Sequence, residues 1–493
     1  MSEIKAAVDL SLISHTNAGK TTLARTLLGR NVGEVRDAPH VTARADAHTM
    51  IETAQGDALR LWDTPGLGDS ARLAKRLEGS ANPIGWFLSQ VWDRWRDRPF
   101  WSSQQAIRNV REHADVVLYL VNAAENPADA GYVGPEMRIL AWIGKPAIVL
   151  LNQVGEPRPH ADEAAEEARW RAQVAPYGFV HSVLTLDAFA RCWVQEFALL
   201  DAIAAALPAE KRGVFARLGE TWRARRMSAF DASMEVIAAQ LARAACDREP
   251  LDEDGMRAKL RGVGAALGIG REGAAPAQER AMKRLARRLD DDIRATTDRL
   301  IEIHGLEGRA AAEVLSRLAG DFAVEARASE GKAAVFGGIV SGALTGLAAD
   351  LAAGGLTFGA GLLAGGVLGA LGAAGVARGY NVVRGAKETA VRWADEFLSA
   401  FFSSALLRYL AVAHYGRGRG EWTRSEHPAF WADAVTAVVA PRRQSLAAIW
   451  RERAGDCDPS MLQAALHGEV TGAALDLLER LYPGALARAE AVS

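Results

Sequence analysis

Three consecutive residues near the N-terminus, Gly19, Lys20 and Thr21, have the types and order needed to hold a phosphate group. They follow the apolar run AVDLSLIS (7–14) and open a helical pattern, which is the context in which such a loop binds phosphate. The backbone N–H groups of the loop form a concave nest for phosphate oxygens, and the helix N-terminus adds its positive dipole end. Lys20 is then expected to reach the β- and γ-phosphates and Thr21 to place its hydroxyl on Mg²⁺.

A second acidic motif follows at the spacing that this chemistry needs. Asp63-Thr64-Pro65-Gly66 comes directly after the apolar run ALRLW, where Asp63 is expected to hold Mg²⁺ through water. The N–H group of Gly66 is expected to sense the γ-phosphate. The polar segment between the motifs contains Thr42, which either caps Mg²⁺ when a γ-phosphate is present or is an ordinary loop threonine. The two motifs together predict a site for a nucleoside triphosphate with Mg²⁺.

These motifs resemble the TrmE/Era-type branch of P-loop GTPases, whose first loop reads G-x-x-N-x-G-K-[ST] and whose third motif reads D-x-P-G. Asn17 to Thr21 match the first pattern and Asp63 to Gly66 match the second. More loosely, the whole chain is similar to predicted GTPases of proteobacteria that carry a C-terminal domain of unknown function. The resemblance implies that GTP or GDP is bound by Asn17, Ala18, Gly19, Lys20, Thr21, Thr22, Asn152 and Gln153. It further implies catalytic roles for Lys20, Thr42 and Gly66, and metal contacts from Thr21, Thr42 and Asp63.

The base-reading end departs from the family pattern. Where the family has N-K-x-D, this chain has Asn152-Gln153-Val154-Gly155, so the aspartate that accepts two hydrogen bonds from guanine is missing. Glu156 is a candidate substitute. Because a charged bidentate contact of this kind contributes strongly to recognition, the preference for guanine is left open. The fifth motif is not recognisable, although Thr185 to Asp187 lies near its expected place.

Two departures concern the phosphate end. Ser14 stands where the first loop glycine is expected, which leaves the nest, Lys20 and Thr21 in place. Leu67 stands where Ras-type enzymes carry a glutamine that orients water. The resemblance implies that Asn17 instead helps to hold a K⁺ ion and that slow turnover rises on self-association. The alternative is that Asn17 only forms hydrogen bonds within the loop.

Residues 1–206 predict an α/β fold, a P-loop G domain with a mostly parallel sheet and flanking helices. Apolar runs alternate there with helical patterns, and Gln55-Gly56-Asp57 predicts a hairpin between two strands. An insertion at about 70–113 is rich in aromatic residues, among them Trp86, Phe87, Trp92, Trp95, Phe100 and Trp101. Those side chains either pack onto the domain or contact a partner or membrane surface, in a segment that follows the nucleotide-sensing motif directly.

Beyond residue 206 the strand signals fade, and a mainly α-helical region is expected. Helices are predicted near 220–246 and 276–303 within a region 207–332, and a last helical region covers 378–493. Between them, residues 333–377 form an apolar, glycine-rich segment whose one charged residue is Asp350. Glycines recur every fourth residue at Gly338, Gly342, Gly346, Gly361, Gly365 and Gly369. The segment predicts a glycine-zipper hairpin that crosses a membrane, with a buried hairpin in a soluble protein as the alternative.

Length, net charge and cysteine content limit the number of domains and the classes of function. With 493 residues the chain is expected to form two or three domains, and its net charge of −2 argues against bulk nucleic-acid binding. Its three cysteines, far apart in sequence, suggest a reducing cytoplasm and no disulfide, and no signal peptide is visible. We therefore expect a switch at the cytoplasmic face of the inner membrane that contacts lipid and self-associates through its G domain or glycine zipper. A nucleotide-gated pore or remodelling protein and a soluble, non-hydrolysing scaffold are the alternatives.

Overall fold

The computed structural model describes residues 6–29, 32, 45–90, 97–154, 157–188, 191–250, 274–306, 380–384, 389–415, 428–453 and 457–486. Several predictions lie outside these residues, namely those for Thr42, Trp92, Trp95, Gly155, Glu156 and the glycine-rich segment 333–377. The chain divides into two compact units. The first comprises Met1–Ser228, Ala413–Glu421 and Leu481–Ser493, and the second comprises Ala229–Val412 and Trp422–Arg480.

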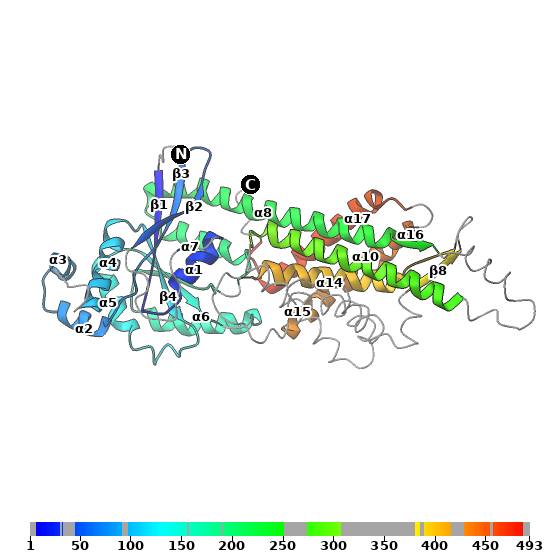
Figure 1. The fold of residues 1–493 in the computed structure, drawn as a ribbon. Helices are drawn as coiled ribbons and strands as arrows, with labels where there is room; N and C mark the ends of the chain where they lie inside the picture. Colours follow the sequence, from blue (N-terminus) through cyan, green and yellow to red (C-terminus); the bar gives the residue numbers. More distant parts are fainter. Residues whose placement is uncertain are drawn as a thin grey trace, which may run out of the picture. The chain divides into compact units, whose positions relative to one another are not determined.

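The first unit is built on a six-stranded sheet in the order β2-β3-β1-β4-β5-β6 (Figure 1). Its strands are β1 (Ala6–Ser14), β2 (Asp46–Glu52), β3 (Asp57–Asp63), β4 (Val116–Asn122), β5 (Ala147–Asn152) and β6 (Val180–Thr185). Only β2 runs antiparallel to its neighbour, in a hairpin with β3 that turns at Gly56 with φ of +88°. The predicted α/β fold and the predicted hairpin are confirmed.

Helices cover the sheet because alternate strand residues on both faces are apolar. The helices of this unit are α1 (Lys20–Leu28), α2 (Ser70–Leu77), α3 (Pro83–Ser89), α4 (Arg98–Glu112), α5 (Val133–Ile143), α6 (His160–Val174) and α7 (Gln195–Ala206). One face of the sheet packs against α2 to α6 in a single hydrophobic cluster. In α3 and α4, within the predicted insertion, Phe87 and Phe100 are buried in that cluster. These two aromatic side chains therefore pack onto the domain.

The second unit is mainly helical, as predicted. Its helices are α10 (Ala274–Ile303), α14 (Asp395–Ala413), α15 (Ala429–Val439), α16 (Arg443–Glu452), α17 (Pro459–Leu481) and the C-terminal part of α8 (Ala209–Cys246). In Figure 1, the C-terminal part of α8 lies lengthwise beside α10 and α14. Arg243 of α8 pairs with Asp292 of α10, and Arg408 of α14 donates a hydrogen bond to Gln240 of α8.

The second unit also contains three short strands, in the region where the strand signals of the sequence fade. A three-stranded antiparallel sheet in the order β7-β9-β8 is built from β7 (Arg248–Pro250), β8 (Tyr380–Arg384) and β9 (Thr389–Trp393). Each strand has only three to five residues, too few to establish a period of two against alanine- and arginine-rich surroundings. The pairing of β7 with β9 joins segments about 140 residues apart, and no local pattern reports that contact.

The expectation that the chain has no disulfide is also wrong. Cys246 and Cys457 form a disulfide with their Cα atoms 5.3 Å apart, across a sequence separation of 211 residues. This Cα distance lies in the usual range for disulfides. The pair could not be predicted from sequence spacing. The fold brings the end of α8 to the start of α17, and no local pattern reports that contact. Cys192 is a free, buried thiol.

Among the described residues, one helix is long and apolar enough to cross a membrane. It is α14, with a mean hydropathy of 1.3 over the best window, of which 72% is buried inside the protein. Phe401, Phe402 and Tyr409 of this helix are almost fully buried, as is typical of a helix in a protein core. The span predicted from sequence is a different segment, 333–377.

Candidate nucleotide-binding site

The first loop joins the end of β1 to the start of α1 and has two residues with left-handed backbone. Asn17 has φ of +70° and Gly19 has φ of +86°. A Cβ atom at Gly19 would lie 2.5 Å from Nδ2 of Asn152, so both the backbone and the available space require glycine here. No side chain of the described residues caps the N-terminus of α1. Its first N–H groups are therefore placed to bind an anion.

Lys20 lies within this loop as a buried cation. Its Nζ donates to Oγ of Ser14 at 2.8 Å and lies 3.5 Å from the carbonyl oxygen of His15. Burial lowers the pKa of Lys20 to about 8, although the carboxylates of Asp63 and Glu136 act in the opposite direction. A bound phosphate would supply the negative charge that stabilises the ammonium. The serine in place of the first glycine thus gives Lys20 a hydroxyl partner.

Thr21 and Asp63 meet at the position predicted for the metal. Oγ1 of Thr21 donates to Oδ2 of Asp63 at 2.6 Å, and the Asp63 side chain is 2% exposed. Burial raises the pKa of Asp63 to about 6, while Thr21 and Lys20 partly offset that effect. Within the described part of the chain, Oδ1 of Asp63 is buried and has no hydrogen-bond partner.

These groups fit Mg²⁺, which prefers hard oxygen ligands and usually keeps several waters and substrate phosphate oxygens. The hydroxyl of Thr21 and the carboxylate of Asp63 would supply the protein's part of such a shell. No group of three or more His, Cys, Asp or Glu residues at metal-binding distance occurs among the described residues. The metal, when bound, would neutralise the charge on the phosphate oxygens.

The third motif lies directly against the first loop. The Leu67 N–H donates to the carbonyl oxygen of Ser14 at 2.9 Å. A Cβ atom at Gly66 would lie 3.0 Å from Thr16 and 3.2 Å from Nζ of Lys20, so this glycine allows close approach. The Leu67 side chain is fully buried in the hydrophobic cluster. It is therefore turned away from the phosphate region, in keeping with the prediction that it cannot orient water.

Two serines on α4 hold the third motif and were missed by sequence reasoning. Oγ of Ser102 donates to the carbonyl oxygen of Gly66 at 3.0 Å, and Oγ of Ser103 accepts from the Gly68 N–H at 3.1 Å. Both side chains are buried. The sequence feature that could have pointed to them is the pair of small hydroxyl residues among the aromatic residues of the insertion.

Asn152 connects three segments at the base-reading end. Its Nδ2 donates to the carbonyl oxygen of Ala18 at 2.8 Å, and its Oδ1 accepts from the Ala188 N–H at 2.8 Å. Gln153, with φ of +61°, donates from Nε2 to the carbonyl oxygen of Asn17 at 3.4 Å. The family-like asparagine thus ties the first loop to the segment after β6, where the fifth motif was expected. Asp187 accepts a hydrogen bond from the Val154 N–H in the same region.

A buried acid, Glu136 on α5, fixes the start of the first loop and was also missed. It lies 2.8 Å from Nδ1 of His15, and the hydroxyl of Tyr119 donates to its second oxygen at 2.7 Å. The His15 ring stacks on Tyr132 with a centroid distance of 4.7 Å. Burial, together with the neighbouring Glu136, raises the pKa of Tyr119 well above its usual range. Helical periodicity alone does not distinguish such an acid from a surface glutamate.

The fold brings together most of the residues predicted from sequence. The structure places Asn17, Ala18, Gly19, Lys20, Thr21, Asp63, Gly66, Asn152 and Gln153 around the loop, and Thr22 in the first turn of α1. Thr42 stays a prediction, because it lies outside the described residues.

Two family models match this chain. One, described as "50S ribosome-binding GTPase", matches residues 9–153. The other, described as "Domain of unknown function (DUF3482)", matches residues 171–482. No curated protein matches the chain.

Three solved structures illustrate the similarity. Era in complex with MgGDPNP and a segment of 16S ribosomal RNA is 16% identical over 41% of this chain and 57% of that chain, with a TM-score of 0.31. A variant of Aquifex aeolicus Era bound to GDP and AlF4⁻ is 16% identical over the same shares, with a TM-score of 0.29. The chloroplast translocon components atToc33 and psToc159 give 15% identity, 38% and 72% coverage, and a TM-score of 0.24. The match thus spans little more than half the length of the two Era chains.

Proposed function

The chain belongs to the DUF3482 family and begins with a P-loop GTPase domain, and on this basis we propose that it is a GTP-binding switch that hydrolyses GTP slowly. The observation that carries the proposal is the pairing of Thr21 with Asp63 beside Lys20, with Oδ1 of Asp63 buried and without a hydrogen-bond partner among the described residues. A nucleoside triphosphate with Mg²⁺ satisfies all three groups at once.

The proposed reaction is phosphoryl transfer to water, with charge stabilisation as its main source of rate. Lys20 and the N–H groups at the start of α1 bind the β- and γ-phosphates and stabilise the charge that develops on them. Thr21 and Asp63 would hold Mg²⁺, and the Gly66 N–H would contact the γ-phosphate. Because Leu67 is buried, no side chain at that position orients the attacking water. Turnover without a partner is therefore expected to be slow.

A K⁺ ion held by Asn17 is the proposed source of additional positive charge. The left-handed backbone of Asn17 places this residue at the outer bend of the first loop, with its carbonyl oxygen hydrogen-bonded to Gln153. Hydrolysis is then expected to be faster in KCl than in NaCl at equal ionic strength. Equal rates in the two salts would contradict the proposed K⁺ site.

Guanine is proposed as the base despite the altered fourth motif. Asn152 keeps its connections to Ala18 and Ala188, so the backbone that faces a base is held in place. The aspartate that normally reads guanine is replaced by Gly155, which lowers the expected selectivity for guanine over other bases.

The nucleotide state is proposed to reach the rest of the protein through α4. Ser102 donates to the Gly66 carbonyl oxygen and Ser103 accepts from the Gly68 N–H, so a movement of Gly66 toward a γ-phosphate is expected to change the Ser102 bond directly and the Ser103 bond through Leu67 and Gly68. We also propose that the segment 333–377 contacts membrane lipid at the cytoplasmic face of the inner membrane. The protein is further proposed to self-associate.

Calorimetric titration of the full chain with GTP, ATP and XTP in Mg²⁺ tests nucleotide binding and base preference. GTP is expected to bind most tightly, and Lys20→Ala is expected to abolish the heat of binding for all three nucleotides. Lys75→Ala, which removes an exposed lysine of α2, is the matched control and should bind like the unmodified protein. Absence of binding to the unmodified protein would refute the proposal, and tighter binding of ATP would refute the choice of base.

A further inference from the structure

The second unit carries a pair of sulfur atoms that plays no part in the nucleotide site. Cys246 is the last residue of α8, and Cys457 lies two residues before the first residue of α17. Their disulfide joins two segments separated by 211 residues. Both residues are only partly buried. The bond is therefore a surface link between helix ends and not a part of the apolar core.

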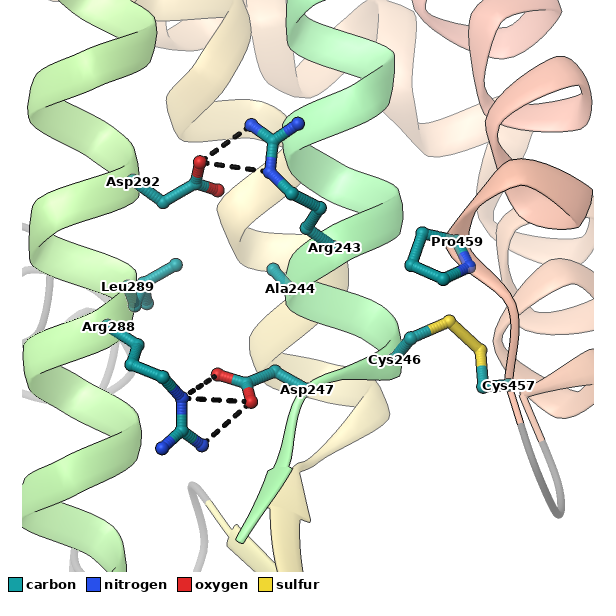
Figure 2. Close-up of a pocket in the computed structure, with 9 residues that line it drawn as sticks. All are labelled: Arg243, Ala244, Cys246, Asp247, Arg288, Leu289, Asp292, Cys457 and Pro459. Carbon is teal, nitrogen blue, oxygen red and sulfur yellow. Dashed lines mark hydrogen bonds and ion pairs between the residues drawn. A yellow bond between two sulfur atoms is a disulfide. The ribbon is translucent and has the colours of Figure 1, made fainter.

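A pocket opens beside this bond. It has a volume of about 370 Å³ and is lined by both cysteines, by Arg243, Asp247, Arg288 and Asp292, and by Ala244, Leu289 and Pro459. Figure 2 shows two ion pairs between α10 and the end of α8, with the S–S bond leading from Cys246 to the segment before α17. The volume lies at the lower end of the range of about 300–1,000 Å³ for small-molecule sites. A small thiol thus has room to approach the disulfide.

The charges around the pocket suit attack by a thiolate. Asp247 follows Cys246 directly, and its carboxylate pairs with Arg288 at 2.7 Å. Arg243 pairs with Asp292 at 2.6 Å on the same side of the pocket. Because each carboxylate in the lining has a guanidinium partner, an anionic sulfur meets no uncompensated negative charge there.

The third cysteine does not compete for this chemistry. Cys192 is fully buried, and burial raises the pKa of its thiol to about 12. A thiol of that kind forms almost no thiolate at neutral pH and is inert. Thiol reactivity in the described part of the chain is therefore confined to Cys246 and Cys457.

We propose that the Cys246–Cys457 bond is a reversible modification site, opened and closed by thiol–disulfide exchange with low-molecular-weight thiols that enter from the pocket. A thiolate of the small thiol attacks one cysteine sulfur, forming a mixed disulfide, and the other cysteine leaves as a thiolate. A second small thiolate attacks the mixed disulfide, which yields the oxidised small molecule and the second cysteine thiolate. The two cysteines take up two protons, so the protein gains two electrons and two small thiols lose them.

Exchange changes one specific connection. The reduced protein keeps the ion pairs between α10 and the end of α8, because none of them involves sulfur. The covalent link from α8 to the segment before α17 is lost. Thiol–disulfide exchange would thus make or break the covalent link between α8 and the segment before α17. This proposal does not depend on the proposed nucleotide function.

The test uses the full chain equilibrated with mixtures of reduced and oxidised glutathione, then rapidly desalted to remove glutathione and labelled at neutral pH with a maleimide carrying polyethylene glycol. Without denaturant, oxidised protein is expected to take up no label and reduced protein two labels, with full reversal on reoxidation. Cys192→Ser should behave in the same way. Cys246→Ser should lose the two-label shift and instead form a mixed disulfide with glutathione at Cys457, visible as added mass.

Two results would overturn the proposal. One is uptake of both labels by protein equilibrated with oxidised glutathione, which would mean that the bond does not form in solution. The other is a bond that glutathione reduces only after the protein is unfolded by denaturant, which would make it a purely structural link.

Discussion

Gly19 combines a left-handed backbone, with φ of +86°, and a neighbouring amide that lies 2.5 Å from the position of a Cβ atom. Gly19→Ala is therefore expected to abolish nucleotide binding, because the new methyl group displaces Asn152 and shifts the first loop. Gly29 provides a matched control, since it has φ of +63° and nothing within 4 Å of a Cβ. Gly29→Ala should lower stability by about 1–2 kcal/mol and leave binding unchanged.

Calorimetry and thermal unfolding of the two glycine variants separate the effect of backbone strain from that of the clash. Equal losses of binding in both variants would show that left-handed strain alone accounts for the requirement at Gly19.

Asp63 is expected to destabilise the nucleotide-free protein at neutral pH. Its pKa is raised from about 3.8 to about 6 by burial, so between these values the folded state holds more protons than the unfolded state. Stability from this group therefore falls as pH rises from about 4 to 6, by a total of about 3 kcal/mol, and is then constant. Asp63→Asn should remove that loss and weaken Mg²⁺-dependent binding.

The melting temperature of Asp63→Asn relative to the unmodified protein, measured from pH 4 to 8 without nucleotide, checks this expectation. The difference should grow with pH up to about 6 and then level off. Asp433→Asn, at an exposed position of α15, should show no such trend. A constant difference at all pH values would contradict the role given to Asp63.

At the residue scale, the sequence predicted the groups that lie within one short motif. Lys20 and Thr21 are adjacent, and their loop geometry follows from glycine and a following helix. Glu136 contacts His15 across 121 residues, and Ser102 contacts Gly66 across 36. Such contacts depend on how helices pack on the sheet, and the residue types involved are common on any helix surface.

Among the elements, α7 and α8 are joined by a buried carboxylate. Glu196 of α7 is fully buried, accepts from Nε1 of Trp222 at 2.6 Å and from Arg226 of α8 at 2.8 Å, and also pairs with Arg191. Glu196→Gln leaves two buried guanidinium groups with an incomplete partner. We expect a loss of about 3–5 kcal/mol in the free energy of unfolding of the first unit.

Urea unfolding followed by tryptophan fluorescence measures this loss, because Trp222 is part of the cluster. Glu210→Gln, at an exposed position in the first turn of α8, is the control and should change stability by less than about 0.5 kcal/mol. Similar midpoints for both variants would show that the buried cluster does not stabilise the unit.

Long, strongly patterned elements were predictable, and short ones were not. The strands β4 and β5 are nearly continuous apolar runs, and β1 is mostly apolar; all three are buried on both faces, so sequence alone located them. The strands β7, β8 and β9 depend on pairing partners far away in sequence, and the disulfide depends on the same long-range arrangement. Sequence patterns report local preference and burial, not which distant segments meet.

For the whole molecule, the decisive prediction concerns residues 333–377. Replacing this segment with a glycine–serine linker of equal length is expected to abolish flotation with vesicles of phosphatidylethanolamine and phosphatidylglycerol. GTP binding should persist, because the described nucleotide site uses only residues of the first unit. Equal flotation of both proteins in a sucrose gradient would refute the membrane hairpin.

Composition and length predicted two or three domains, and the chain divides into two compact units whose bounds differ from the predicted ones. The assignment of Ala413–Glu421 and Leu481–Ser493 to the first unit was not predictable. Tyr482, for example, meets His414 at 2.7 Å, and the His414 carbonyl oxygen accepts from the Arg191 N–H. No local sequence pattern shows that a late segment packs against an earlier unit.

Ser14 has a consequence for the interval between nucleotides. In the proposed function, departure of a triphosphate or its product would leave Lys20 without an anionic ligand in a site where its side chain is nearly inaccessible to water. The hydroxyl of Ser14, 2.8 Å away, takes the place of the lost oxygen. A glycine at that position would leave the ammonium with one fewer partner. We therefore expect the serine in place of the first loop glycine to stabilise the nucleotide-free protein and so to favour release of nucleotide.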